Sequence, residues 1–236
     1  MIVRPAGSSQ LLITQPDHAA LSARIMRQWR AGGFPDAPRR SSILLAIEEH
    51  DNGWREVDAA PVVDGVTGRI LDFVSAPDPI RRAVWPRGVD RLAGTPYAAA
   101  LVAQHAVHIY RRNRDDPQWA PFFTEMEATR DRHLHSAGAL SLDEVLREYA
   151  FVRIGDLASL TFCNGWIEPQ TDDVGYTIRF DGTHLSITPD PFEGRQIAIE
   201  IAARELPNRP FRSPSEAHAA FSGAREVAVT GIALGG

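Results

Sequence analysis

Four side chains have the types and positions to hold a divalent metal ion: His18, His50, Asp51 and Asp156. His50 and Asp51 are neighbours at the end of the apolar stretch ILLAIEEHDNGW, residues 43–54. Helices often end in polar residues and a glycine, so this pair alone also fits an ordinary helix end. Asp156 is harder to explain in this way, because a carboxylate on a buried helix face is costly to desolvate unless it is paired or binds a cation.

Two predicted helices carry the first two histidines. Apolar residues recur at helical spacing within residues 15–29, and His18 lies on the same stripe. A second helix is expected to start near Ser41, a good N-cap, and the three-residue step from Ile47 makes His50 the next inward position. Both imidazole rings are therefore expected to face the core.

Two further predicted helices bring a carboxylate and another histidine inward. Residues 96–112 place His105 on an apolar face, and Ser141 with Glu144 forms a capping box for a long helix that carries Asp156. A single histidine on an apolar stripe is more often a hydrogen-bonded core residue than a ligand. Because buried polar groups need partners, we expect these side chains to satisfy one another in one cluster.

The donor atoms of this cluster indicate the kind of ion. Imidazoles and carboxylates without thiolates suit a divalent transition metal such as manganese, iron, nickel, cobalt or zinc. Two histidines and two aspartates leave coordination positions open, which is typical of catalytic rather than structural ions. We expect one ion rather than two, with His105 as a further candidate ligand.

Composition limits the other classes of function. The chain has 236 residues, a formal net charge of -5 and a single cysteine, Cys163. These features disfavour nucleic-acid binding and exclude an intramolecular disulfide or a Cys-rich zinc motif. All 25 basic side chains are arginine, which excludes lysine nucleophiles. There is neither a signal peptide nor an apolar run long enough to span a membrane, so a cytoplasmic protein without a membrane partner is expected.

The expected fold class is mainly α with a small C-terminal antiparallel β-sheet, α+β overall. Residues 1–167 should form an all-helical core that holds the metal, and residues 168–236 a β-rich appendage packed on it. Asp181-Gly182 joins two alternating runs and is a strong hairpin signal. Two more strands are predicted in RQIAIEIAARELP and REVAVTGIAL.

The order His18, His50-Asp51 and Asp156, the last within IGDLASL, resembles the H...HD...D signature of the HD-domain superfamily of metal-dependent phosphohydrolases. AIEEHDNGW is similar to that superfamily's LLHDIGK. The resemblance implies a helical HD-like body in which these four residues ligate the metal. It also implies that histidines between the dyad and the last Asp could hold a second ion, with the candidates His105, His133 and His135.

Within that superfamily, residues 1–165 resemble an uncharacterised bacterial family of unknown function through QPDHAAL, AIEEHDNGW, LDFVSAP and PYAAALVAQH. This likeness implies a fold but no substrate. The sequence departs from the phosphohydrolase pattern at Trp54, where a lysine often follows the dyad. An arginine could replace that basic group, and the candidates are Arg24, Arg55, Arg111 and Arg153.

These observations favour a metal-dependent hydrolase, namely a phosphohydrolase that acts on a nucleotide or small phosphate ester through a metal-activated water. Asp51, Asp58 and Asp72 are the candidate catalytic carboxylates; the last two could serve as general acids or as partners of the histidines, or simply form turns. The alternatives are an iron-dependent HD-type oxygenase and a non-catalytic module that binds a ligand or a structural ion. A small-molecule substrate is the expected partner, and a homo-oligomer stays open.

Overall fold

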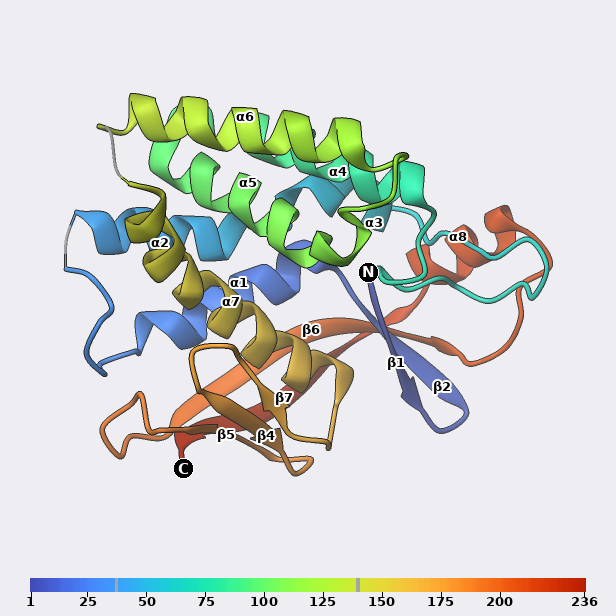
Figure 1. The fold of residues 1–236 in the computed structure, drawn as a ribbon. Coiled ribbons are helices and arrows are strands. Elements are labelled where there is room, and N and C mark those ends of the chain that lie inside the picture. Colours follow the sequence, from blue (N-terminus) through green and yellow to red (C-terminus); the bar gives the residue numbers. More distant parts are fainter. Residues whose placement is uncertain (37, 139–140) are drawn as a thin grey trace.

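A computed structural model of the chain describes residues 1–36, 38–138 and 141–236. Seven strands form one sheet in the order β1-β2-β6-β7-β5-β4-β3, and it curls as a half-barrel beneath the helices (Figure 1). The strands are β1 (Ile2–Ala6), β2 (Ser9–Ile13), β3 (Gln170–Thr171), β4 (Thr177–Phe180), β5 (His184–Thr188), β6 (Ile197–Pro207) and β7 (Arg225–Gly235).

This sheet shows that the expected fold class was wrong. The core is not all-helical, and the sheet is neither small nor confined to the C-terminal part. Strands β1 and β2 come from the start of the chain, and β2 pairs with β6, with Ser9 opposite Pro207. The sheet is also mixed, since β5 and β7 run parallel. Such pairing joins opposite ends of the chain, and the local patterns from which strands are predicted do not reveal it. The division at residue 167 stays a prediction.

The four helices predicted to carry the candidate ligands lie close to their predicted positions. The helices are α1 (Gln15–Arg27), α2 (Arg39–Glu49), η1 (Asn52–Trp54), α3 (Arg55–Asp58), α4 (Asp78–Asp90), α5 (Pro96–Ile109), η2 (Arg111–Asn113), α6 (Ala120–Ser136), α7 (Leu142–Asn164) and α8 (Pro214–Ser222). The capping box of Ser141 and Glu144 is confirmed at the start of α7, and Gly165 ends that helix in a left-handed conformation. The expected N-cap at Ser41 is wrong, because α2 already begins at Arg39.

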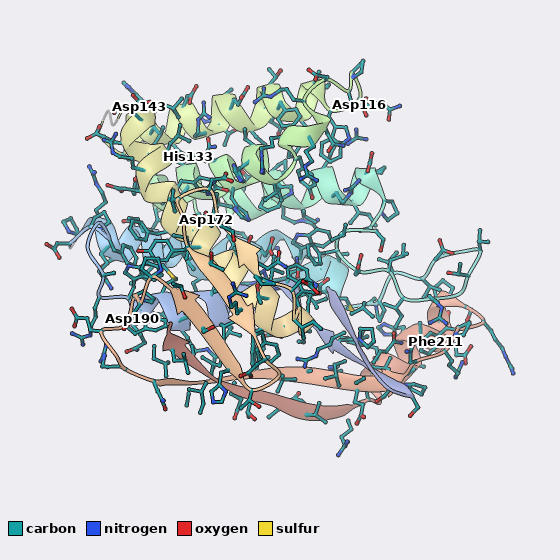
Figure 2. All side chains as sticks on the ribbon, turned by 60° about the horizontal axis from the view of Figure 1, so that its bottom comes forward. Asp116, His133, Asp143, Asp172, Asp190 and Phe211 are labelled. Carbon is teal, nitrogen blue, oxygen red and sulfur yellow. The ribbon has the colours of Figure 1, made fainter. Side chains whose placement is uncertain are left out.

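Two apolar cores lie on either side of α1 and α7, and side chains fill the space between the helices and the sheet (Figure 2). On α1, Met26 belongs to the core shared with the other helices, while Ile25 belongs to the core against the sheet. On α7, Val152 in the first half of the helix belongs to the core shared with the other helices, and Phe162 near its end belongs to the core against the sheet. These two helices therefore form the middle layer of three, and polar side chains on them are buried deep in the molecule.

Candidate metal centre

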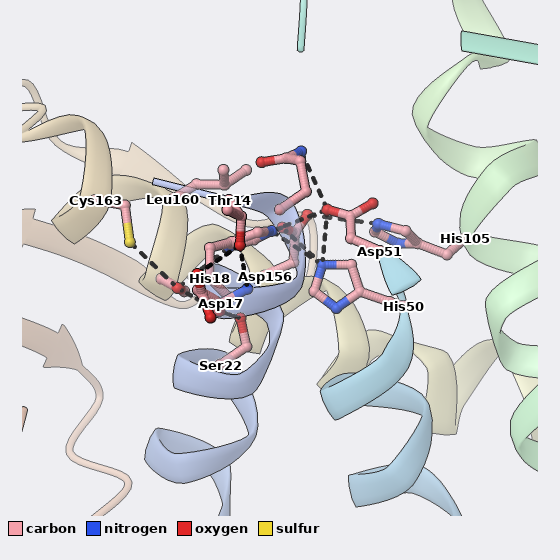
Figure 3. Close-up of polar contacts among 12 residues, drawn as sticks. Thr14, Asp17, His18, Ser22, His50, Asp51, His105, Asp156, Leu160 and Cys163 are labelled. Carbon is pink, nitrogen blue, oxygen red and sulfur yellow. Dashed lines mark hydrogen bonds and ion pairs between the residues drawn. The ribbon is translucent and has the colours of Figure 1, made fainter. Parts of the chain in front are cut away.

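Five side chains from four helical segments meet in the interior, and we call them the His/Asp cluster: His18 on α1, His50 and Asp51 at the end of α2, His105 on α5 and Asp156 on α7 (Figure 3). The three histidines are at most 2% exposed. Asp51 is also buried, and 16% of the Asp156 side chain is exposed. All five predicted metal ligands thus lie in one place.

The ligand atoms fall into two groups of three that share His50, namely His18, His50 and Asp51, and His50, His105 and Asp156, and the atoms of each group lie within 4.8 Å of one another. His18 Nε2 lies 3.0 Å from Asp51 Oδ2, 3.5 Å from Asp156 Oδ1 and 3.2 Å from His50 Nε2. His50 Nε2 lies 3.4 Å from each of the same two carboxylate oxygens. Ligands about 2.1 Å from a metal lie about 3.0 Å apart in octahedral and about 3.4 Å apart in tetrahedral geometry. The donor set and its spacing therefore fit a divalent transition metal.

Hydrogen bonds on the outer side of two rings fix which nitrogen faces the cluster. His50 Nδ1 donates to the carbonyl oxygen of Ile47 at 2.7 Å, which leaves the Nε2 lone pair of the neutral ring directed at the cluster. The Ser159 hydroxyl donates to the main-chain carbonyl of His18 at 2.8 Å, so it accepts from His18 Nδ1 at 3.2 Å. In metal-binding histidines, the ring nitrogen that does not bind the metal characteristically donates a hydrogen bond to a protein oxygen in this manner.

The two carboxylates of the cluster also favour binding of a cation. Burial alone raises the pKa of Asp51, but the charge of His50 and hydrogen bonds from the histidines lower it below its usual range. The pKa of Asp156 is lowered by the same neighbours against the effect of burial. Burial lowers the pKa of His50, but the two carboxylates outweigh it and raise that pKa to about 10. Without an ion, a proton on His50 supplies the positive charge that a bound metal would supply.

His105 extends the cluster toward a second position. Its Nε2 lies 3.7 Å from Asp156 Oδ2, and one ligand atom from each of His50, His105 and Asp156 lies within 4.8 Å of the others. Burial lowers the pKa of His105 to about 4, so its ring is neutral and able to ligate. His105 Nδ1 and the Tyr149 hydroxyl are hydrogen bonded at 2.9 Å.

The residues after the dyad explain the Asn52-Gly53 pair. A Cβ atom on Gly53 would lie 1.9 Å from the carbonyl oxygen of Val84, so only glycine allows α4 to pack this closely. Asn52 Nδ2 donates to the carbonyl of Gly88 at 3.2 Å and ties the same turn to α4. The turn that follows Asp51 is thereby held in place.

The other predicted site residues lie outside the cluster. Asp58 is buried and accepts hydrogen bonds from the main-chain nitrogens of Met1 and Gln15, at 2.7 and 2.6 Å. Asp72 bonds only to Ser75 within its own loop, as far as the described residues show. His133 and His135 lie on α6, and His133 is seen on the helical side of the molecule in Figure 2.

A cleft of about 490 Å³ reaches the cluster at His105 and Asp156. It is also lined by Arg111, Arg112 and Arg153, with Trp166, Asp172 and Asp173. Arg153 pairs with Asp172 at 3.1 Å and with Asp173 at 2.7 Å, and Asp172 lies beside α7 in Figure 2. Of the four candidate arginines, Arg111 and Arg153 line this cleft, whereas Arg24 bonds to the Glu200 carbonyl and Arg55 to Glu49.

Three residues that contact the cluster were missed in the sequence: Gln15, Tyr149 and Ser159. Spacing could have found two of them, because Gln15 lies three residues before His18 and Ser159 three residues after Asp156, each on the same helix face. Tyr149 carries no comparable signal, since a tyrosine seven residues before Asp156 on a buried stripe is indistinguishable from a core residue.

The chain combines helices with a curled, mixed seven-stranded sheet, and a buried His/Asp cluster lies between its helices. Residues 1–208 match the family model described as "Protein of unknown function (DUF3891)", and the chain belongs to that family. No curated protein and no solved structure matches the chain. Within the described residues, no helix combines the length and apolar character needed to cross a membrane. The resemblance to the HD-domain superfamily stays a prediction.

Proposed function

We propose that this protein is a metal-dependent hydrolase that cleaves a small phosphate ester, such as a nucleotide, at the His/Asp cluster. The observation that carries the proposal is the spacing of His18 Nε2, His50 Nε2 and Asp51 Oδ2, which matches three ligands of one ion, with Asp156 Oδ1 3.5 and 3.4 Å from the two histidine nitrogens. The cleft that ends at Asp156 gives a substrate access to that ion.

His18, His50, Asp51 and Asp156 would hold a divalent ion, which would supply a bound water of near-neutral pKa and polarise a phosphoryl oxygen. His18 and His50 contribute Nε2 atoms that Ser159 and the Ile47 carbonyl orient in advance. Asp156 is the most exposed member with 16% of its side chain accessible, so the substrate approaches from its side.

The arginines of the cleft favour an anionic substrate. Arg111 and Arg112 are exposed in the same cleft and can donate to phosphate oxygens, which replaces the basic group missing at Trp54. Arg153 is already paired with Asp172 and Asp173, so its charge is less available. A phosphate ester fits this distribution better than a neutral ester does.

The experiment is a hydrolysis assay on a panel of phosphomonoesters and nucleotides, with manganese, iron, cobalt, nickel or zinc added to metal-free protein. Asp51→Ala tests the cluster, and Asp131→Ala is the matched control, because Asp131 is an exposed carboxylate on α6. We expect metal-dependent phosphate release by the wild type and the control only. Equal release by Asp51→Ala, or none by metal-loaded wild type, contradicts the proposal.

A second candidate is an iron-dependent oxygenase. The observation that favours it is the second group of ligand atoms from His50, His105 and Asp156, which provides a place for a second ion beside the first. Two irons per chain and oxygen consumption without phosphate release would favour this reaction. Ion binding with neither reaction on the panel would leave the third alternative, a non-catalytic ion-binding module.

A further inference from the structure

Gln15 is a buried glutamine that contacts the metal centre but belongs to none of the expected ligand types. It is the first residue of α1 and is 2% exposed. Its Nε2 donates to Asp51 Oδ2 at 3.2 Å, the same oxygen that lies 3.0 Å from His18 Nε2. Gln15 therefore acts directly on a ligand atom of the cluster.

The hydrogen bonds of the Gln15 amide leave one atom without a partner. Nε2 must face Asp51, because the flipped amide would place its oxygen against a carboxylate oxygen and two acceptors would repel. Gln15 Oε1 is buried and has no hydrogen-bond partner among the residues that the structure describes. Amide C–O and C–N bonds are about 1.2 and 1.3 Å long, so Oε1 lies within about 6 Å of Asp51 Oδ2.

The main chain of Gln15 is held without any help from its side chain. Its nitrogen donates to Asp58 Oδ2 at 2.6 Å, and Asp58 is itself fixed by the main-chain nitrogen of Met1. The helix is capped by Thr14, whose hydroxyl accepts from the nitrogen of Asp17 at 3.1 Å. The side chain is thus not required to begin α1, which points to a role at the cluster.

We propose that Gln15 is a positioning residue of the metal site, an inference that rests on the proposed function. Its Nε2 holds Asp51 with Oδ2 directed at the ion, and its Oε1 accepts a hydrogen bond from a water molecule beside the ion. Water is the expected donor, because a buried acceptor is ordinarily satisfied by protein or by ordered water and Oε1 has no partner among the described residues. The amide nitrogen thus positions a ligand, and the amide oxygen binds a water.

The first test compares Gln15→Met with the wild type by calorimetric titration of the metal-free protein with Mn²⁺. Methionine keeps the length of the side chain but makes neither hydrogen bond, and loss of such an outer contact lowers metal affinity about 10- to 100-fold. Gln10→Met is the matched control, because Gln10 is also a buried glutamine, at 6% exposure, but bonds to the Pro207 carbonyl in the sheet. We expect that control to bind Mn²⁺ as the wild type does.

The outcomes separate this inference from the proposed function. Wild type that binds no ion overturns both, whereas wild type that binds Mn²⁺ with Gln15→Met equally tight overturns only the role of Gln15. A lower melting temperature with unchanged affinity would make Gln15 merely structural and also overturn it. If Gln15→Met does not fold, Gln15→Asn serves instead, since its amide is one methylene too short to reach Asp51.

The second test addresses Oε1 and needs no variant. A crystal structure of the Mn²⁺-loaded wild type is expected to show an ordered water beside the ion and within hydrogen-bond distance of Gln15 Oε1. An Oε1 atom that faces only protein in that structure would overturn this half of the proposal.

Discussion

Metal binding to the His/Asp cluster should release about one proton per ion at pH 7.5. His50 carries that proton, because its pKa is raised to about 10, more than two units above the assay pH. Asp51 and Asp156 have lowered pKa values and are already ionised, and His105, with a pKa of about 4, is already neutral. Among these groups, only His50 must change its protonation state when the ion binds.

The sign and size of the pH dependence follow from this proton. A proton on His50 competes with the ion, so the apparent affinity falls as pH falls below 10 and rises as pH increases toward it. Each pH unit changes the binding free energy by about 1.4 kcal/mol, which is about tenfold in affinity. Between roughly pH 7 and pH 9 the dissociation constant should therefore decrease by about two orders of magnitude.

Calorimetry in buffers of different ionisation enthalpy measures this proton directly, because the slope of the observed enthalpy against the buffer enthalpy gives the number released. His50→Gln is the control, and it should bind the ion more weakly and release no proton from this position. A slope of zero for the wild type, together with pH-independent affinity, would refute the reasoning about His50.

Three further predictions concern the surroundings of the cluster. Ser159→Ala removes the hydroxyl that orients the His18 ring, and we expect about 10- to 100-fold weaker metal binding in the same titration with little change in the fold. Arg112→Ala should raise KM for an anionic ester about tenfold and leave metal affinity unchanged, which steady-state kinetics and titration check together. Gly53→Ala should destabilise the fold by about 1–3 kcal/mol in denaturant unfolding, since its Cβ would lie 1.9 Å from Val84 O. Gly94→Ala, with nothing within 4 Å, should cost little by comparison.

The membership of the cluster could be predicted because each member lies on a strongly patterned helix. Helical spacing places His18 and Asp156 on buried faces of α1 and α7, and an inward carboxylate requires a partner. Their convergence is then the simplest way to satisfy several buried polar groups at once. The cleft and its arginines were less predictable, since Arg112 shows no pattern that separates it from a solvated surface charge.

The sheet could not be predicted in full, for a different physical reason. The hairpin at Asp181-Gly182 is a local feature that its turn residues predict. The structure confirms it as β4 and β5. The pairing of β2 with β6 joins residues from opposite ends of the chain, so no short turn sets its register, and β6 also packs against α1. The short strand β1 also has little length in which alternation could be recognised.

The most direct test of the metal centre is elemental analysis of purified wild type and Asp51→Ala after both are equilibrated with a transition metal and freed of unbound ion. The account predicts about one ion per wild-type chain, and a folded, helical variant that retains almost none. Stoichiometric metal in Asp51→Ala, or its absence from a folded wild type at neutral pH, would contradict the claim that these side chains form a metal site.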